Sequence, residues 1–161
     1  MLVIGINIVP YLAAYAQHRY KCPVPDAVRF PSMSLINQTI INKLTIRPAH
    51  INPGNWNLRI VVAEPKYGLK DLSQYDYLPP AGEREVFNVL RMDFDATLHK
   101  YMDTERYERG VFYKDSVASF IKKYELAGLI SEDALLKKHV RWKRYTSRYR
   151  AQTMQLDINF K

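Results

Sequence analysis

The chain has 161 residues, of which 47% are hydrophobic, and a formal net charge of +8 at pH 7. This length suits one domain, or one domain with tails, and the apolar fraction argues against wholesale disorder. The single cysteine, Cys22, excludes an intramolecular disulfide and a zinc site built from cysteines.

Residues 1–16 form an apolar run without a charged side chain. The run is shorter than the about 20 residues that a membrane-spanning helix needs, and Asn7 and Pro10 interrupt it. It also lacks the basic start of a secretory signal and the arginines of an organelle presequence. We therefore expect a buried strand or short helix here, with a membrane-contacting anchor and a cleaved signal as the alternatives.

The following residues are predicted to be mainly extended. Prolines between residues 22 and 31 disfavour a helix, because proline and the residue before it both avoid helix interiors. Residues 35–44 fit a short helix or a strand, while the apolar, β-branched run 58–63 predicts a short strand. Residues 1–80 are thus predicted to form an extended or irregular N-terminal segment with an apolar start.

A long amphipathic helix is predicted from Glu83 onward, after the proline-rich breaker at 79–82. Its apolar residues recur at steps of three and four and form one stripe, which comprises Phe87, Leu90, Phe94, Leu98 and Tyr101. A second helix is predicted to begin with Asp115 or Ser116 as its cap and to end near Gly128.

A third helix is predicted to begin after Ser131, whose hydroxyl can cap it. From Met154 to Phe160 apolar and polar residues alternate, which is typical of a half-buried strand. That strand needs a partner, either this chain's own residues 58–63 or the sheet edge of a neighbouring protein. The predicted fold is mainly α with long extended segments and a few short β-strands. It has a small helical body at about 83–145, an irregular N-terminal half and a terminal strand.

The positive charge is concentrated at the C-terminal end. Residues 1–136 carry 16 basic and 15 acidic side chains, whereas residues 137–161 carry 8 basic and 1 acidic side chain. We therefore divide the chain into the N-terminal segment 1–80, a helical body 81–136 and a basic-aromatic tail 137–161. A cationic tail on a near-neutral body indicates a polyanionic neighbour.

The most informative part of the tail is 137–150, which holds seven cations, no acid and three interleaved aromatic residues. On a helix the aromatic residues would share one face, and the cations would lie along neighbouring lines. Arginine binds phosphate through paired hydrogen bonds, and aromatic rings stack on unpaired bases. We predict RNA contact here, with an acidic protein, lipid headgroups or a merely solvated face as the alternatives. The predicted RNA-binding residues are Lys137, Lys138, Arg141, Trp142, Lys143, Arg144, Tyr145, Arg148, Tyr149 and Arg150.

Few residues suggest catalysis or metal binding. Asp95 and His99 lie one helical turn apart, with Asp93 nearly opposite, but two ligands make a weak metal site at best. An exposed helical pair is the simpler interpretation of Asp95 and His99. Cys22 fits no nucleophile signature, and the sequence contains no phosphate-binding glycine loop, nucleophile elbow or HExxH motif. We expect neither an enzyme nor a bound metal or cofactor.

One part of the chain resembles a known family. The matching residues are Arg91–Phe94, Tyr101, Phe112 and Phe120–Tyr124. Their spacing is similar to that of the mitochondrion-specific small-subunit ribosomal protein family numbered twenty-three, in which an Arg-x-x-Phe helix precedes a Phe-Val/Leu-x-x-Tyr helix. Trp56 ahead of the Pro79–Pro80 pair also resembles that family, although the spacing here is longer.

The resemblance covers about residues 56–124, and the uncharged start and basic-aromatic tail depart from the family pattern. It implies a non-catalytic protein that braces the small subunit of an organellar ribosome.

The basic tail and the resemblance favour the same class of function. We expect a non-catalytic structural subunit of a large ribonucleoprotein assembly, most simply a small-subunit protein of the mitochondrial ribosome, located in the mitochondrion. Its expected partners are ribosomal RNA, contacted by the tail, and neighbouring assembly proteins, with a membrane as a further candidate for residues 1–16. The alternatives are an accessory subunit of a mitochondrial inner-membrane respiratory complex and a virion structural protein.

Overall fold

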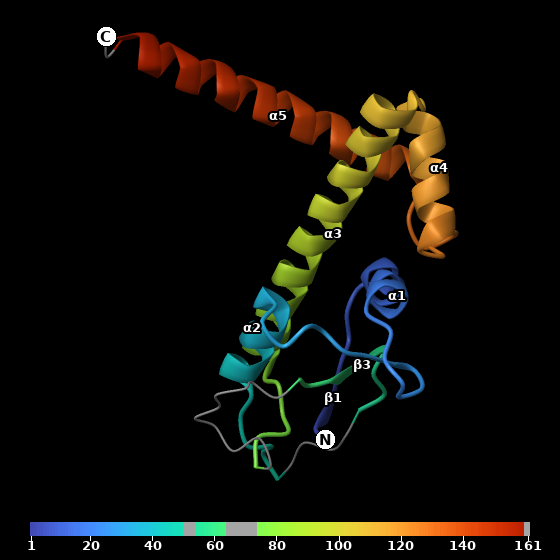
Figure 1. Cartoon of the computed structure of the whole chain (residues 1–161). Helices are drawn as coiled ribbons and strands as arrows, with labels where there is room; N and C mark the ends of the chain where they lie inside the picture. The colour runs from blue at the N-terminus through green and yellow to red at the C-terminus, as the bar shows by residue number, and fades with distance from the viewer. Residues whose placement is uncertain (50–53, 64–73, 160–161) are drawn as a thin grey trace. The chain divides into compact units, whose positions relative to one another are not determined.

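The computed structural model describes residues 1–49, 54–63 and 74–159, and the side chains of its last helix through Tyr149. The chain forms two compact units. Unit 1 comprises Met1–Ala96 with Tyr124–Leu126, and unit 2 comprises Thr97–Lys123 with Ala127–Lys161. Helices predominate, and unit 1 also contains a small three-stranded sheet (Figure 1). The predicted class, mainly α with a few short strands, is confirmed.

The sheet of unit 1 has β3 at its centre. β1 (Val3–Ile6) pairs with β3 (Leu58–Val61) in antiparallel orientation, and β2 (Ala27–Val28) pairs with β3 in parallel orientation. Ile4 and Ile60 lie opposite each other and are both buried. The short strand predicted within residues 58–63 is confirmed.

Two helices complete the N-terminal half. α1 (Pro10–Arg19) has proline in its first turn, where the missing N–H costs no helical hydrogen bond. α2 (Leu35–Lys43) is capped by Ser34, whose Oγ accepts a hydrogen bond from the Asn37 backbone N–H at 3.2 Å. This cap favours the helix over the strand that the sequence left open. The N-terminal half is therefore more regular than the extended segment that its prolines predicted.

The apolar side chains of residues 1–16 point largely into unit 1. The buried ones are Ile4, Ile6, Ile8, Leu12, Ala13, Tyr15 and Ala16. The expected buried strand and the expected short helix are both present, one after the other, as β1 and α1. Within the described residues, no helix combines the length and apolar character needed to cross a membrane.

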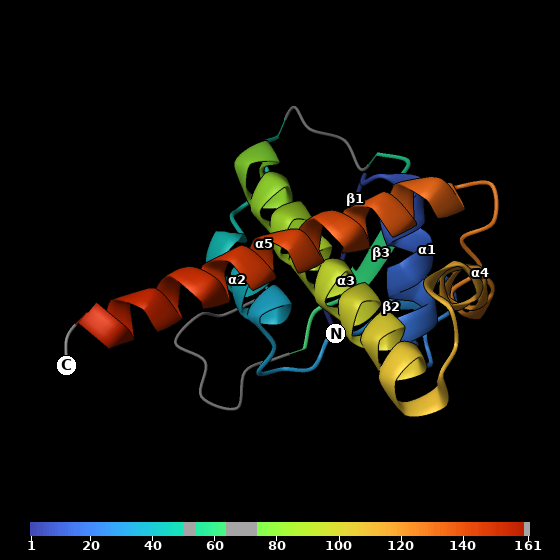
Figure 2. The same cartoon turned by 90° about the horizontal axis from the view of Figure 1, so that it is seen from above.

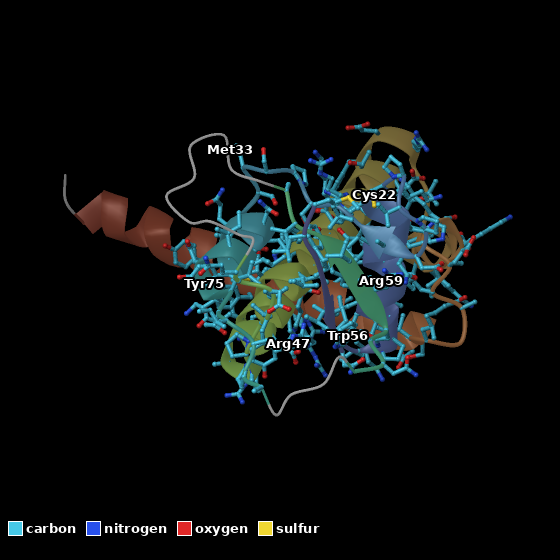
Figure 3. The ribbon with its side chains drawn as sticks, turned by 90° about the horizontal axis from the view of Figure 1, so that it is seen from below. Cys22, Met33, Arg47, Trp56, Arg59 and Tyr75 are labelled. Atoms are coloured by element: carbon cyan, nitrogen blue, oxygen red, sulfur yellow. The ribbon has the colours of Figure 1, made fainter. Side chains whose placement is uncertain are left out.

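A close approach fixes one end of the sheet. The ring of Trp56 lies against Gly5 in β1, where an added Cβ would stand only 2.0 Å from a ring atom. Arg47 and Trp56 line the same pocket at this end (Figure 3). Nε of Arg47 donates a hydrogen bond to the Asp76 carboxylate at 3.1 Å. Glycine at position 5 is therefore required by packing.

The long helix α3 (Pro80–Arg109) runs through both units. Its fully buried residues recur at every fourth position and are Val86, Leu90, Phe94, Leu98 and Met102. Three members of the predicted stripe belong to this series, while Phe87 and Tyr101 are half-buried. The helix begins three residues before Glu83, because proline fits a first turn, and Gly110, with a φ of 71°, follows its end.

α4 (Tyr113–Lys123) and α5 (Glu132–Asn159) pack against each other in unit 2. α4 begins two residues before Asp115, the first of its two predicted caps. Ser131 caps α5 as predicted, because its Oγ accepts a hydrogen bond from a backbone N–H of the first turn at 3.2 Å. The cap satisfies one of the backbone N–H groups that the first turn of α5 leaves without a partner inside the helix.

The predicted terminal strand is wrong from Met154 to Asn159, because α5 continues through these residues (Figure 1). Phe160 lies outside the described residues. Ala151 and Leu156 are good helix formers, and a helix already under way gains one hydrogen bond for each added residue. The predicted strand pairing also fails, since β3 has β1 on one side and β2 on the other. The predicted body and tail are joined by α5, which crosses residue 137 without a break.

Candidate nucleic-acid interface

One side of α5 carries a line of exposed cations. Its members follow each other at steps of four, three and four residues and are Lys137, Arg141, Arg144 and Arg148. Since an α-helix turns by about 100° per residue, all four fall within roughly 60° of the helix circumference. The line is about 16 Å long at a rise of about 1.5 Å per residue. We call these four residues the α5 stripe; Figure 2 shows the helix that carries it.

The arginines of the α5 stripe are not neutralised within the part of the chain that the structure describes. Lys137 pairs with Asp133 one turn earlier, at 2.6 Å. Arg141, Arg144 and Arg148 form no ion pair with any described residue. Like charges three or four residues apart each cost a helix about 0.2–0.5 kcal/mol. The stripe is therefore unfavourable for the isolated helix and suits a polyanionic partner.

Two tyrosines lie beside the α5 stripe. Tyr145 is 70% exposed and Tyr149 is 64% exposed. They stand four residues apart, so they share one side of the helix, and each follows a stripe arginine directly in the sequence. Exposed tyrosines next to arginines are typical of binding surfaces. The stripe and the two tyrosines together form the candidate interface.

The opposite side of α5 holds the helix within unit 2. Leu135 and His139 are completely buried. The indole of Trp142 stacks on the imidazole of His99 in α3, with ring centroids 4.3 Å apart and planes inclined by 10°. Trp142, which the sequence grouped with the two tyrosines, is therefore engaged inside the unit and is half-buried.

Lys143 is enclosed by partners from α3 and α4. Its Nζ donates hydrogen bonds to the hydroxyl oxygens of Tyr107 at 2.7 Å and Tyr113 at 2.8 Å, and lies 3.1 Å from Oδ1 of Asp103. Burial opposes the charged form, but these hydrogen bonds outweigh it and raise the pKa of Lys143. The hydrogen bond from Lys143 in turn lowers the pKa of Tyr107. This cation stabilises unit 2 and is not directed toward a partner.

A pair of histidines lies next to this lysine. Nδ1 of His99 and Nδ1 of His139 are 3.0 Å apart, so one of the two donates a hydrogen bond to the other. Nε2 of His139 lies 3.4 Å from Oδ1 of Asp103 without forming a hydrogen bond to it. Burial lowers the pKa of His139; Asp103 opposes this shift and Lys143 adds to it. The histidine pair, like Trp142, belongs to the interior of the unit.

Asp93 has its own partners in unit 1. Its Oδ2 accepts hydrogen bonds from the hydroxyls of Tyr15 at 2.7 Å and Tyr20 at 2.8 Å, and Nε of Arg19 lies 3.5 Å away. Burial, reinforced by Asp93 and opposed by Arg19, raises the pKa of Tyr20 to about 12, so its phenol stays a donor. Among the described residues, no group of three or more side chains is arranged to hold a metal ion.

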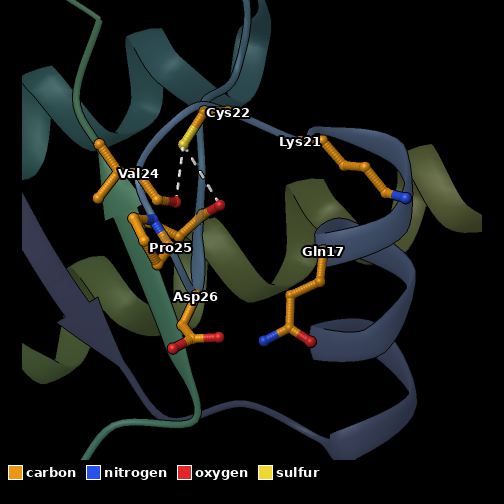
Figure 4. A pocket seen from close by; sticks show the side chains of 7 residues that line it. Gln17, Lys21, Cys22, Val24, Pro25 and Asp26 are labelled. Carbon is orange, nitrogen blue, oxygen red and sulfur yellow. Dashed lines mark hydrogen bonds between the residues drawn. The ribbon is translucent and has the colours of Figure 1, made fainter.

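The only cysteine of the chain lies at a small pocket in unit 1. The pocket has a volume of about 300 Å³, and residues between Gln17 and Ala27 line it (Figure 4). Sγ of Cys22 lies 3.3 Å from the carbonyl oxygen of Ala27 and 3.7 Å from that of Val24, within reach of a thiol donor. The half-buried thiol thus contacts the backbone of its own loop.

The structure sorts the ten predicted RNA-binding residues into groups. It brings the four residues of the α5 stripe together with Tyr145 and Tyr149 on the outside of the helix. Trp142 and Lys143 are engaged internally, Lys138 is half-buried, and the side chain of Arg150 lies outside the described part. The internal partners Tyr107 and Tyr113 lie 36 and 30 residues from Lys143, and no local spacing in the sequence links them to it.

No protein-family model, curated protein or solved structure matches this chain.

Proposed function

We propose that this protein is a non-catalytic, RNA-binding structural subunit of a ribonucleoprotein assembly and that the α5 stripe contacts RNA phosphates. The supporting observation is the set of exposed arginines on one side of a helix without ion-pair partners among the described residues. Each such arginine can bind a phosphate through two hydrogen bonds, and each neutralised phosphate releases a counterion.

The length of the α5 stripe favours a nucleic acid over an acidic protein as the partner. A line of cations about 16 Å long, with one or more in every helical turn, matches the continuous charge of a phosphate backbone. An acidic protein would need carboxylates in a row of matching length to engage the same line of cations.

For the assembly, we propose the small subunit of the mitochondrial ribosome, which would place the protein in the mitochondrion. The support is the resemblance of residues 56–124 to the mitochondrion-specific ribosomal family. On this proposal the partners are ribosomal RNA and neighbouring ribosomal proteins, and the chain needs neither a metal nor a cofactor.

The assembly is tested by sedimentation of the native protein from a detergent lysate through a sucrose gradient, with and without ribonuclease. We expect co-migration with a ribosomal subunit, lost on RNA digestion. Migration with a ribonuclease-resistant membrane complex would contradict the proposal and favour an accessory subunit of a respiratory complex.

The contact itself is tested with two matched triple variants. The stripe variant replaces three arginines of α5 and comprises Arg141→Gln, Arg144→Gln and Arg148→Gln. The control variant removes the same charge from exposed lysines elsewhere in unit 2 and comprises Lys100→Gln, Lys114→Gln and Lys122→Gln. Only the stripe variant is expected to lose RNA affinity.

A further inference from the structure

The sequence of α5 contains a repeated pair of residues, an arginine followed by a tyrosine. Arg144 precedes Tyr145, and Arg148 precedes Tyr149, so the pair recurs after four residues. All four side chains are exposed. Because four residues make slightly more than one helical turn, the two arginines lie along one line and the two tyrosines along a neighbouring line. Each turn presents one cation and one aromatic ring.

The spacing of the two tyrosines suits one base between their rings. Four residues of α-helix advance about 6 Å along the axis. Bases in a stacked strand are about 3.4 Å apart, so a base with a ring on either side needs about 7 Å between the two rings. Both tyrosines are exposed, and rotation of their side chains can supply the remaining difference.

The neighbouring tryptophan does not extend this arrangement. Trp142 lies three residues before Tyr145, but its ring is stacked on His99 and is half-buried. Of the three aromatic residues in 137–150, Tyr145 and Tyr149 are the two whose side chains are exposed. The two rings lie one helical turn apart, and each is next to a cation. The spacing of the helix therefore sets the distance between the two rings.

We infer that Tyr145 and Tyr149 hold one unpaired base between their rings, while Arg144 and Arg148 bind the phosphates on either side of that nucleotide. The inference rests on the proposed RNA-binding function and adds that the RNA is single-stranded at this contact. A base in a duplex is paired, and its neighbours in the stack cover both of its faces. The tyrosine rings therefore cannot stack on it. A strand with splayed bases exposes them for stacking.

The test compares a 12-nucleotide RNA carrying 2-aminopurine at its centre with the same RNA annealed to its complement. Affinities of the full chain are measured by fluorescence anisotropy, and stacking is read from quenching of the 2-aminopurine. The test variant is Tyr145→Ala with Tyr149→Ala, and the matched variant is Tyr145→Phe with Tyr149→Phe, which keeps the rings. Circular dichroism shows that each variant retains its helices.

We expect the wild type to bind the single strand at least about 10-fold more tightly than the duplex and to quench the 2-aminopurine. The alanine variant should lose at least about 10-fold in affinity for the single strand, with the duplex affinity unchanged, while the phenylalanine variant behaves as wild type. Equal affinity for the two RNAs, or an alanine variant as tight as wild type, would overturn the inference and leave RNA binding intact. Loss of binding in the phenylalanine variant would also overturn it. Absence of binding to either RNA would overturn the proposed function as well.

Discussion

Lys143 and Arg144 are neighbours in the sequence, but their side chains leave α5 in directions about 100° apart and meet different surroundings. Lys143 turns inward and donates hydrogen bonds to Tyr107 and Tyr113. Arg144 turns outward and has no ion-pair partner among the described residues. The inner side of α5 uses its polar groups to hold unit 2 together, whereas Arg141, Arg144 and Arg148 on the outer side form no ion pair with a described residue. Neighbouring cations of one run thus differ in their surroundings, since Lys143 has partners within unit 2 and Arg144 is exposed.

The largest effect on stability is expected from the inner side. Replacing His139 by alanine removes a completely buried ring that lies against Tyr113 and hydrogen-bonds to His99. We expect the free energy of unfolding to fall by about 2–4 kcal/mol, because the change leaves a cavity and an unsatisfied hydrogen-bonding group. Urea unfolding followed by circular dichroism measures this, with Arg144→Ala as the outer-side control. Equal effects of the two changes would contradict the distinction between the two sides.

The next largest effect on stability is expected from replacing Lys143, and it distinguishes this residue from its sequence neighbour Arg144. Lys143→Met removes the cation that Tyr107, Tyr113 and Asp103 share. We expect a loss of about 1–2 kcal/mol in the free energy of unfolding, because two tyrosine hydroxyls lose a hydrogen-bond donor and Asp103 loses an ion-pair partner. Arg144→Met should stay within about 0.5 kcal/mol of wild type in the same assay. A destabilised Arg144→Met protein would show that the outer arginine also supports the fold.

The free energy of unfolding should depend on pH because His139 is buried. Burial lowers the pKa of His139 below its ordinary value of 6.5, so the unfolded chain takes up this proton at a higher pH than the folded protein does. The corresponding stability is fully present above pH 6.5 and is lost as the pH falls through the folded-state pKa. We expect the free energy of unfolding to decrease from pH 7 to 5, by at most about 1.4 kcal/mol per pH unit for this one group. His139→Gln should flatten that decrease; an unchanged slope would assign it to other groups.

The smallest effect on stability is expected on the outer side. The stripe variant removes repulsion between like charges, and its free energy of unfolding should rise by a few tenths of a kcal/mol at low salt. The gain should shrink as salt is added, since exposed charges are screened. Thermal unfolding at two salt concentrations measures this. A loss of more than about 1 kcal/mol would show that the outer arginines stabilise the fold.

The helices were the more predictable part of the fold. The four-residue recurrence of Leu90, Phe94 and Leu98 and the cap at Ser131 are local signals, and both appear in the structure. The helix over residues 35–44 could not be separated from a strand by periodicity, and the Ser34 cap is what distinguishes it. The terminal strand was wrong because an alternating pattern only six or seven residues long does not outweigh a helix already under way.

The candidate site was only partly predictable. Helical spacing correctly places the four cations of the α5 stripe along one side, because that depends on the helix period alone. Spacing could not show that Trp142 stacks on His99, since the two residues are 43 positions apart in the sequence. For the same reason, the enclosure of Lys143 by residues of α3 and α4 had no local signal.

The central claim is tested most directly by measuring RNA affinity as a function of salt for the wild type, the stripe variant and the control variant. If three arginines each bind a phosphate, the stripe variant should bind a labelled single-stranded RNA at least about 10-fold more weakly at low salt. Its plot of log affinity against log salt concentration should be shallower by about 2, at roughly 0.7 per lost phosphate contact on a single strand. The control variant should match the wild type in both respects. An equal loss in the two variants, or an unchanged slope in the stripe variant, would contradict the assignment of the α5 stripe as the RNA contact.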